Sequence, residues 1–267
     1  MDYMAKTSAD IDRMPRGGPD ASCLDRLLET DRPEYLDRDS DDPADAARKR
    51  SVIRALEFTG ELFGSTERFA EIALAEIEDV ADPEILELGA GHGGLSRKLL
   101  DWHPTARLTV TDVDEAAVAA MAAGDLGHDP RATVRRMDAT RIDAPDSSFD
   151  LAVFAQSFHH LPPSQAARVF AEGTRVAHRL VIIDLPRPPS PIHLARLASM
   201  LPFAPLLPFA HDGVISSLRT YSPSALRALA AYADPAIEID LRGGPLSPQI
   251  VVARRGGADA SRSGDQR

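Results

Sequence analysis

Glu84 to Ser96 read EILELGAGHGGLS, and this stretch decides the fold. The apolar run before Gly89 has the composition of a buried strand, and from Leu95 onward apolar residues recur at helical spacing. Glycines at positions 89, 91, 93 and 94 separate the two patterns. A strand that turns sharply into a helix leaves backbone N–H groups open at the helix start, and a nucleotide-like ligand can bind there.

Composition limits the class of protein. The chain has 267 residues, of which 43% are apolar, so it can bury one substantial core with a small addition. A net charge of −11 argues against nucleic acid as the main partner, because phosphate binding needs a basic face. The lone Cys23 excludes an internal disulfide and a cysteine-rich zinc site, and it is typical of a reducing cytoplasm. We expect a cytoplasmic protein.

The termini and the most apolar segment bear on location. The N-terminus has no apolar run of signal-peptide length, so we expect no export signal. Leu197 to Ala210 is the most apolar stretch elsewhere, but prolines interrupt it and it is too short to span a bilayer. We therefore expect no stable membrane insertion.

The two ends differ in composition from the middle of the chain. Residues 1–42 are rich in Asp, Arg, Pro and Ser, which predicts a flexible acidic tail. Within it, PEYLD at 33–37 could fold over a ligand, although a solvated linker is the favoured interpretation. A folded domain is predicted over residues 43–255, beginning with two helices before Asp82, and residues 256–267 are predicted to be disordered.

Strand and helix patterns alternate after the glycine turn. Strands are predicted at 84–88, 106–111, 133–137, 149–154 and 180–185, and helices at 115–123, 163–172, 192–201 and from Ser222. The alternation predicts a doubly wound parallel sheet with ligands at the carboxyl ends of the strands. Strands at 237–241 and 249–253 follow with no helix between them, which predicts an antiparallel hairpin at one edge. The expected fold is therefore α/β, with a mostly parallel, seven-stranded Rossmann-like sheet and an antiparallel edge strand.

The glycine motif alone leaves the ligand open. Gly89 to Gly94 satisfy the dinucleotide pattern G-x-G-x-x-G, and Asp112 follows at the distance of a ribose acid. However, Glu87 lies inside the strand. A carboxylate at that position does not help to bind a pyrophosphate, but it could bind a ligand that carries an ammonium group. Asp138 stands at the end of the third strand, where an adenine amino group could be recognised.

The region from Glu84 to Leu185 contains four motifs that are informative when taken together: ELGAGHGG, TVTDVD, RMDAT and SFDLAVFAQSFHHL. With these motifs, the region resembles the class I S-adenosylmethionine-dependent methyltransferases. The resemblance is to the small-molecule group that includes the ubiquinone/menaquinone-type enzymes. It implies S-adenosylmethionine as the cofactor and the following cofactor-binding residues: Glu87, Gly89, Ala90, Gly91, Asp112, Val113, Asp138, Ala139 and Gln156.

The resemblance also implies roles for these residues. Glu87 orients the methionine ammonium, Gly89 and Gly91 allow close approach, and Asp112 accepts both ribose hydroxyls. Val113, Asp138 and Ala139 lie along the adenine, and Gln156 lies under the methionine part. Two alternatives stay open: Asp112 as the N-cap of the following helix, and Asp138 as a solvated strand end.

Candidates for the acceptor side follow the fourth and fifth strands. His159 and His160 stand where the fourth strand gives way to its loop, so each is a candidate catalytic base or substrate contact, with a packing role equally open. Lid elements are expected near 43–64 and 186–221, and the candidate substrate residues are His211, Arg219 and Tyr221. The apolar run at 197–209 indicates a lipophilic or aromatic acceptor, or else a dimer or core contact. We expect no metal.

The predicted function is methyl transfer from S-adenosylmethionine to an oxygen or carbon of a small lipophilic or aromatic acceptor. One alternative is an NAD(P)-dependent oxidoreductase, and the other is a protein that binds the cofactor without turnover. We expect a small-molecule acceptor as partner, no nucleic acid, and a monomer or homodimer.

Overall fold

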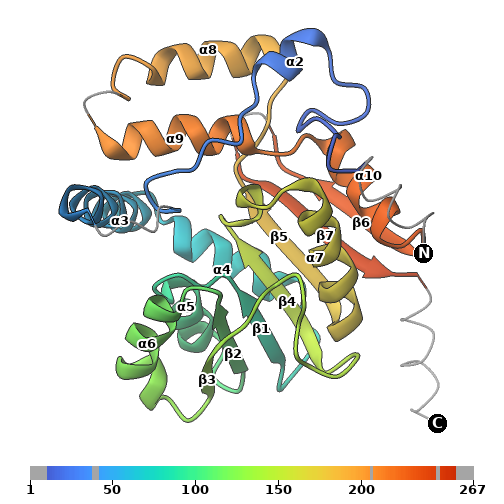
Figure 1. Cartoon of the computed structure of the whole chain (residues 1–267). Coiled ribbons are helices and arrows are strands. Elements are labelled where there is room, and N and C mark those ends of the chain that lie inside the picture. The colour runs from blue at the N-terminus through green and yellow to red at the C-terminus, as the bar shows by residue number, and fades with distance from the viewer. Residues whose placement is uncertain (1–10, 38–41, 205–206, 245–246, 257–267) are drawn as a thin grey trace.

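The computed structural model describes residues 11–37, 42–204, 207–244 and 247–256. In these residues a seven-stranded sheet runs in the order β3-β2-β1-β4-β5-β7-β6 (Figure 1). The strands are β1 (Glu84–Leu88), β2 (Arg107–Asp112), β3 (Ala132–Arg136), β4 (Phe149–Ala155), β5 (Ala177–Asp184), β6 (Ile237–Arg242) and β7 (Gln249–Arg255). The predicted α/β fold is confirmed.

The direction of the strands also follows the prediction. Strands β1 to β5 pair in parallel, and β7 pairs antiparallel with both β5 and β6. The terminal hairpin therefore enters the sheet through its second strand, and β6 forms the outer edge. The carboxyl ends of β1, β2, β4 and β5 consequently meet at one end of the sheet, which is where the candidate site residues lie.

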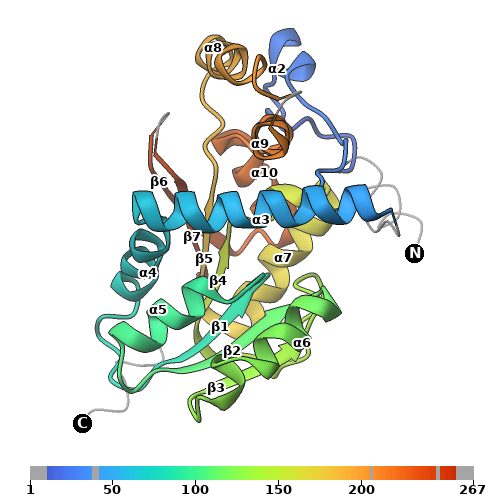
Figure 2. The same ribbon diagram turned by 90° about the vertical axis from the view of Figure 1, so that its left-hand side faces the viewer.

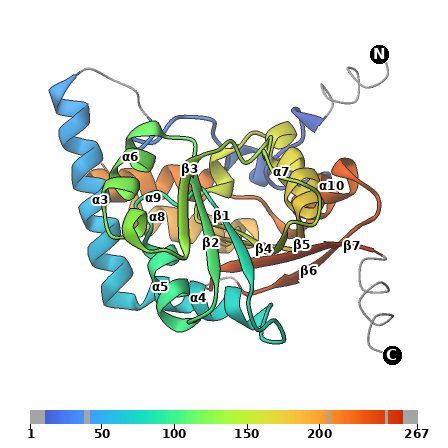
Figure 3. The same ribbon diagram turned by 90° about the horizontal axis from the view of Figure 1, so that it is seen from below.

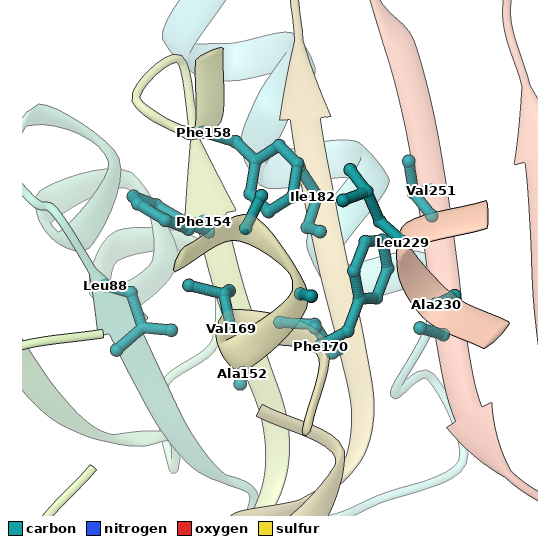
Figure 4. Close-up of a cluster of buried hydrophobic side chains, with 14 of the residues drawn as sticks. Leu88, Ala152, Phe154, Phe158, Val169, Phe170, Ile182, Leu229, Ala230 and Val251 are labelled. Carbon is teal, nitrogen blue, oxygen red and sulfur yellow. The ribbon is translucent and has the colours of Figure 1, made fainter. Parts of the chain in front are cut away.

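Helices cover both faces of the sheet (Figure 3). On one face α7 (Pro163–Val176) packs against β4 and β5, and α10 (Pro223–Ala233) packs against α7 and β6. Phe158 and Phe170 lie in the middle of this cluster (Figure 4). On the other face α4 (Ser65–Ala75), α5 (Gly94–Trp102) and α6 (Glu115–Ala123) bury a second apolar cluster. In the described part of the chain, no helix combines the length and apolarity needed to cross a bilayer.

Three helices gather beyond the ends of the strands. Helix α3 (Pro43–Phe63) lies across the molecule below α8 (Ser190–Met200) and α9 (Pro208–Arg219), and it contacts α9 (Figure 2). Helix α8 confirms the prediction at 192–201. Helix α9 was not predicted, because Pro208 was interpreted as a helix breaker, whereas it occupies the first turn, where a missing N–H costs nothing.

The N-terminal segment differs from the predicted flexible tail. Residues 11–37 lie against the domain and include the short helix α2 (Cys23–Leu27). Arg16 is buried, and its Nη1 donates to the carbonyl oxygens of His159, at 2.9 Å, and Arg219, at 2.7 Å. Its guanidinium also stacks 4.5 Å from the centre of the Tyr221 ring. The rest of the predicted N-terminal tail, at 1–10 and 38–41, and the C-terminal tail from 257 lie outside the described residues.

Candidate active site

The turn after β1 is shaped by two glycines with left-handed backbone. Gly89 has φ +61°, and a Cβ there would lie 2.7 Å from Cε2 of Phe154, so the position excludes any side chain. Gly91 has φ +57°, but a Cβ there would meet no atom within 4 Å. Gly91 therefore borders open space, and its backbone can be approached closely by a ligand.

Asp112 at the end of β2 faces this turn. Its Oδ2 accepts a hydrogen bond from the Gly91 N–H at 2.8 Å, and its Oδ1 accepts one from the Asp114 N–H at 2.9 Å. The N-cap of α6 is Asp114, whose side chain accepts from the Ala116 N–H, so the N-cap alternative for Asp112 is wrong. Each oxygen of an ionised carboxylate has further acceptor capacity, and the Asp112 carboxylate is suited to a vicinal diol.

Glu87 is buried within β1, one strand away from Asp112. The Ser96 hydroxyl at the start of α5 donates to its carboxylate. Burial raises the pKa of Glu87 to about 7, and the negative charge of Asp112 acts in the same direction. A positively charged ligand group placed beside Glu87 would favour its ionised form, and the site is therefore suited to a cation.

The other predicted cofactor residues lie at the same end of the sheet. The Ala90 N–H donates to the Thr111 carbonyl at 2.9 Å, which holds the glycine turn against β2. Asp138 is exposed and accepts from the Thr140 N–H and hydroxyl, each at 2.8 Å, so the solvated strand-end alternative stays open for it. Val113 is exposed, and Ala139 is half-buried against the core.

Gln156 directly follows β4 and has φ +56°, which is uncommon for a residue with a side chain. Its N–H donates to the Ile183 carbonyl at 2.7 Å, and this bond fixes the backbone while leaving the side chain exposed. Strained backbone of this kind concentrates at ligand sites. It is the one position among the predicted cofactor residues where a side chain is held in the left-handed region.

His159 is enclosed by carboxylates. Its Nδ1 lies 2.7 Å from Oδ1 of Asp184 at the end of β5, and its Nε2 lies 3.6 Å from Oε1 of Glu34. Burial by itself lowers the pKa of this histidine, but the Asp184 carboxylate, helped by Glu34, raises it to about 9. The two carboxylates therefore favour a positive charge at this position, which disfavours the role of a free general base for His159.

His160 lies beside His159, with ring centres 4.3 Å apart, and is more accessible. Its Nδ1 is 2.8 Å from Oδ1 of Asp37, and its Nε2 is 3.9 Å from Oε2 of Glu34. Arg219 joins the same group, because it donates to the Asp37 carboxylate and, at 2.6 Å, to the His160 carbonyl. The two histidines and Arg219 are therefore brought together by the N-terminal segment.

The other two predicted substrate residues lie differently. Tyr221 is buried beneath Arg16, and its hydroxyl donates to the Leu161 carbonyl at 2.7 Å. His211 lies 2.9 Å from the Asp212 carboxylate, and its ring is 4.5 Å from the ring of Tyr35. Tyr221 thus has the contacts of a packing residue, whereas His211 borders the N-terminal segment.

Three acidic residues of the site are not among the residues that the sequence predicts: Glu34, Asp37 and Asp184. Asp184 follows an apolar strand and marks a strand end as Asp112 does, so its position was a usable signal. Glu34 and Asp37 belong to the PEYLD piece, which was interpreted as a linker because nothing local shows that it docks.

Comparison with known proteins identifies the nucleotide-binding part. Residues 85–179 match a protein family described as a methyltransferase domain. This region is therefore similar to the S-adenosylmethionine-dependent methyltransferases. The match begins at β1 and ends in β5, and so includes Glu87, Gly91 and Asp112.

A curated relative supports the same family. It is a malonyl-[acyl-carrier protein] O-methyltransferase from Geobacter sulfurreducens, 34% identical over 105 residues. The match covers 39% of this chain and 38% of the relative, so the chain spans about two fifths of the length of that protein.

Solved structures share the fold at low identity. The plantazolicin methyltransferase BpumL, solved with S-adenosylhomocysteine, has a TM-score of 0.62 at 12% identity, and the alignment covers 95% of this chain and 99% of BpumL. The PH0226 protein from Pyrococcus horikoshii OT3 has a TM-score of 0.55 at 16% identity, with coverage of 72% and 91%. These likenesses concern the fold alone, and they extend beyond residues 85–179.

The residues of the methyltransferase domain fit S-adenosylmethionine as its cofactor. The open space at Gly91 gives room for close approach of the cofactor. The carboxylate of Asp112 provides acceptors for a diol, and the buried acid Glu87 provides a partner for an amino group. A nicotinamide cofactor would leave Glu87 without such a partner, so the methyltransferase match and this residue together argue against the oxidoreductase alternative.

Proposed function

We propose that the protein transfers a methyl group from S-adenosylmethionine to an oxygen or carbon of a small acceptor. The observation that carries the proposal is the pairing of Asp112 with the open turn at Gly91, inside a region that matches methyltransferases. When bound, the cofactor supplies a methyl group on a positively charged sulfur. The residues that would hold it are Glu87, Gly89, Gly91, Asp112 and Gln156.

The contribution of the protein to such a reaction is mainly positional. Holding two reactants in line is worth on the order of 7–11 kcal/mol in well-oriented cases. The lid formed by the N-terminal segment, α3, α8 and α9 would exclude water and hold the acceptor against the end of β4. His160 and His211 are the proposed acceptor contacts, because both lie half-buried beside this segment.

A lipophilic or aromatic acceptor is the class we favour. Leu201, Phe203, Leu207 and Phe209 are exposed near the turn between α8 and α9, and apolar side chains left open in this way suit an apolar molecule. The curated relative acts on a malonyl group carried by an acyl-carrier protein, which makes compounds with a free carboxyl group a second class of acceptor to test.

Two measurements test the proposal. Calorimetric titration with S-adenosylhomocysteine and with NAD(H) should show micromolar binding of the first and none of the second; the reverse result would overturn the proposal. Incubation of cell-extract fractions with methyl-tritiated S-adenosylmethionine should then label an acceptor in the presence of the protein. Cofactor binding without labelling of any fraction would favour a protein that binds the cofactor without turnover.

A further inference from the structure

Three side chains from two distant parts of the chain converge beside the end of β4. Within the described residues, Glu34, His159 and His160 form one group whose donor atoms all lie within 4.8 Å of one another. The Glu34 carboxylate lies 3.6 Å from Nε2 of His159 and 3.9 Å from Nε2 of His160. Glu34 and His159 are almost completely buried, so water does not screen them.

The outer atoms of each of these side chains are held by a further residue. Asp184 lies 2.7 Å from Nδ1 of His159, and Asp37 lies 2.8 Å from Nδ1 of His160. The Ser216 hydroxyl donates to Glu34 at 2.7 Å. Metal-binding histidines typically donate their second ring N–H to a carboxylate, which fixes the ring and directs the other nitrogen at the ion. His159 has this arrangement with Asp184, whereas Asp37 lies within ion-pair distance of Nδ1 of His160.

The Nε2 atom of His159 provides a separate observation. It is buried in a side chain that is only 4% exposed, and among the described residues it has no hydrogen-bond partner. A buried polar nitrogen without a partner is unfavourable, because its hydrogen bond to water is lost and not replaced. Oε1 of Glu34 lies 3.6 Å away, which is too long for a hydrogen bond but suited to two ligands of one ion.

We propose that Glu34, His159 and His160 bind a divalent transition-metal ion of the zinc or iron class. Two imidazoles and one carboxylate are a common ligand set for such ions, whereas magnesium and calcium prefer oxygen alone. Zinc bonds of about 2.0–2.2 Å place ligand atoms roughly 3.4 Å apart in a tetrahedron. The three donor atoms lie within 4.8 Å of one another, so each pair is at most about 1.4 Å wider than that spacing. Three protein ligands leave a coordination position for an oxygen of a small molecule.

The site would also tie the N-terminal segment to the domain. Glu34 comes from that segment, while both histidines come from the loop after β4. The inference does not depend on the methyl-transfer proposal, because metal binding is measured without cofactor or acceptor.

The test uses the full chain, stripped of metal with a chelator and titrated with Co²⁺ and Zn²⁺. We expect about one ion per chain, a Co²⁺ visible absorption spectrum typical of nitrogen and oxygen ligands, and no competition from a hundredfold excess of Mg²⁺. Glu34→Gln, His159→Gln and His160→Gln should each weaken Zn²⁺ binding at least about 100-fold, and Asp184→Asn about 10- to 100-fold. The matched control is His103→Gln at the end of α5, which should bind as the unmodified protein does.

Circular dichroism and S-adenosylhomocysteine affinity will show whether each variant folds. If one variant fails to fold, the proposal is still tested by the metal stoichiometry and the Co²⁺ spectrum of the unmodified protein and by the remaining variants. A protein that binds no Zn²⁺, or variants that bind as tightly as the control, would overturn the proposal and make the group an ion-pair cluster only.

Discussion

The cofactor side and the acceptor side of the candidate active site are built in opposite ways. The cofactor side takes Glu87 and Asp112 from two adjacent strands and Gly91 from the turn after the first of them. Backbone N–H groups hold the carboxylate of Asp112. The acceptor side assembles Glu34, His159, Asp184 and Arg219 from segments far apart in the sequence, and the N-terminal segment completes it. One side is therefore fixed by the sheet, and the other depends on a docked segment.

The largest expected effect is on the cofactor side. Asp112→Ala should weaken S-adenosylhomocysteine binding by about 2–4 kcal/mol, because charge-assisted hydrogen bonds are lost and ligand hydroxyls are left unpaired. This corresponds to roughly 30- to 1,000-fold in the dissociation constant measured by calorimetry.

Asp138→Ala is the matched control for this change. Asp138 is exposed whereas Asp112 is buried, so water competes more strongly for hydrogen bonds at Asp138 and a smaller loss is expected. A change below about threefold for Asp112→Ala would mean that the ribose site lies elsewhere, since one charge-assisted hydrogen bond alone is worth more.

The next effect separates the two sides. Arg16→Ala should lower the stability of the docked N-terminal segment by about 2–3 kcal/mol, since it removes two buried hydrogen bonds to carbonyl oxygens and a cation–π contact. Limited proteolysis should then cut within residues 11–37, while S-adenosylhomocysteine affinity stays within about twofold. Arg26→Ala, at an exposed position in α2, is the control. If Arg16→Ala weakened S-adenosylhomocysteine binding as much as it destabilised the N-terminal segment, the cofactor side and the acceptor side would not be independent.

The same difference explains what the sequence could predict. The glycine turn, Asp112 and the strand order follow from local patterns, because apolar periodicity and turn residues act over a few neighbours. Glu34 and Asp37 were missed because their contacts are polar, lie far away in the sequence and leave no periodic pattern. Helix α9 was missed because a proline in a first helical turn has the same appearance in the sequence as a proline that ends a helix.

A pH dependence should sharpen the assignment of Glu87. Its pKa in the folded protein is about 7, against about 4.5 in an unfolded chain, so the folded state holds an extra proton between these values. Stability should therefore fall as pH rises from about 4.5 to 7, by up to about 1.4 kcal/mol per pH unit. A bound amino group favours the ionised form, so S-adenosylhomocysteine affinity should rise about tenfold from pH 5.5 to 7. Glu87→Gln should remove both slopes, and a variant that keeps them would assign them to another group.

The smallest expected effect concerns Tyr221, which the sequence predicted as a substrate residue and which the structure places beneath Arg16. Tyr221→Phe leaves the ring in place and removes the partly buried hydrogen bond to the Leu161 carbonyl, so the free energy of unfolding should fall by about 1 kcal/mol. Tyr232→Phe, at an exposed position in α10, should change stability by less than about 0.5 kcal/mol. Because the ring still packs against Phe158, the KM for an acceptor should be unchanged. A raised KM with unchanged stability would instead assign Tyr221 to the acceptor site. The docked N-terminal segment would then cover the acceptor as well as the core.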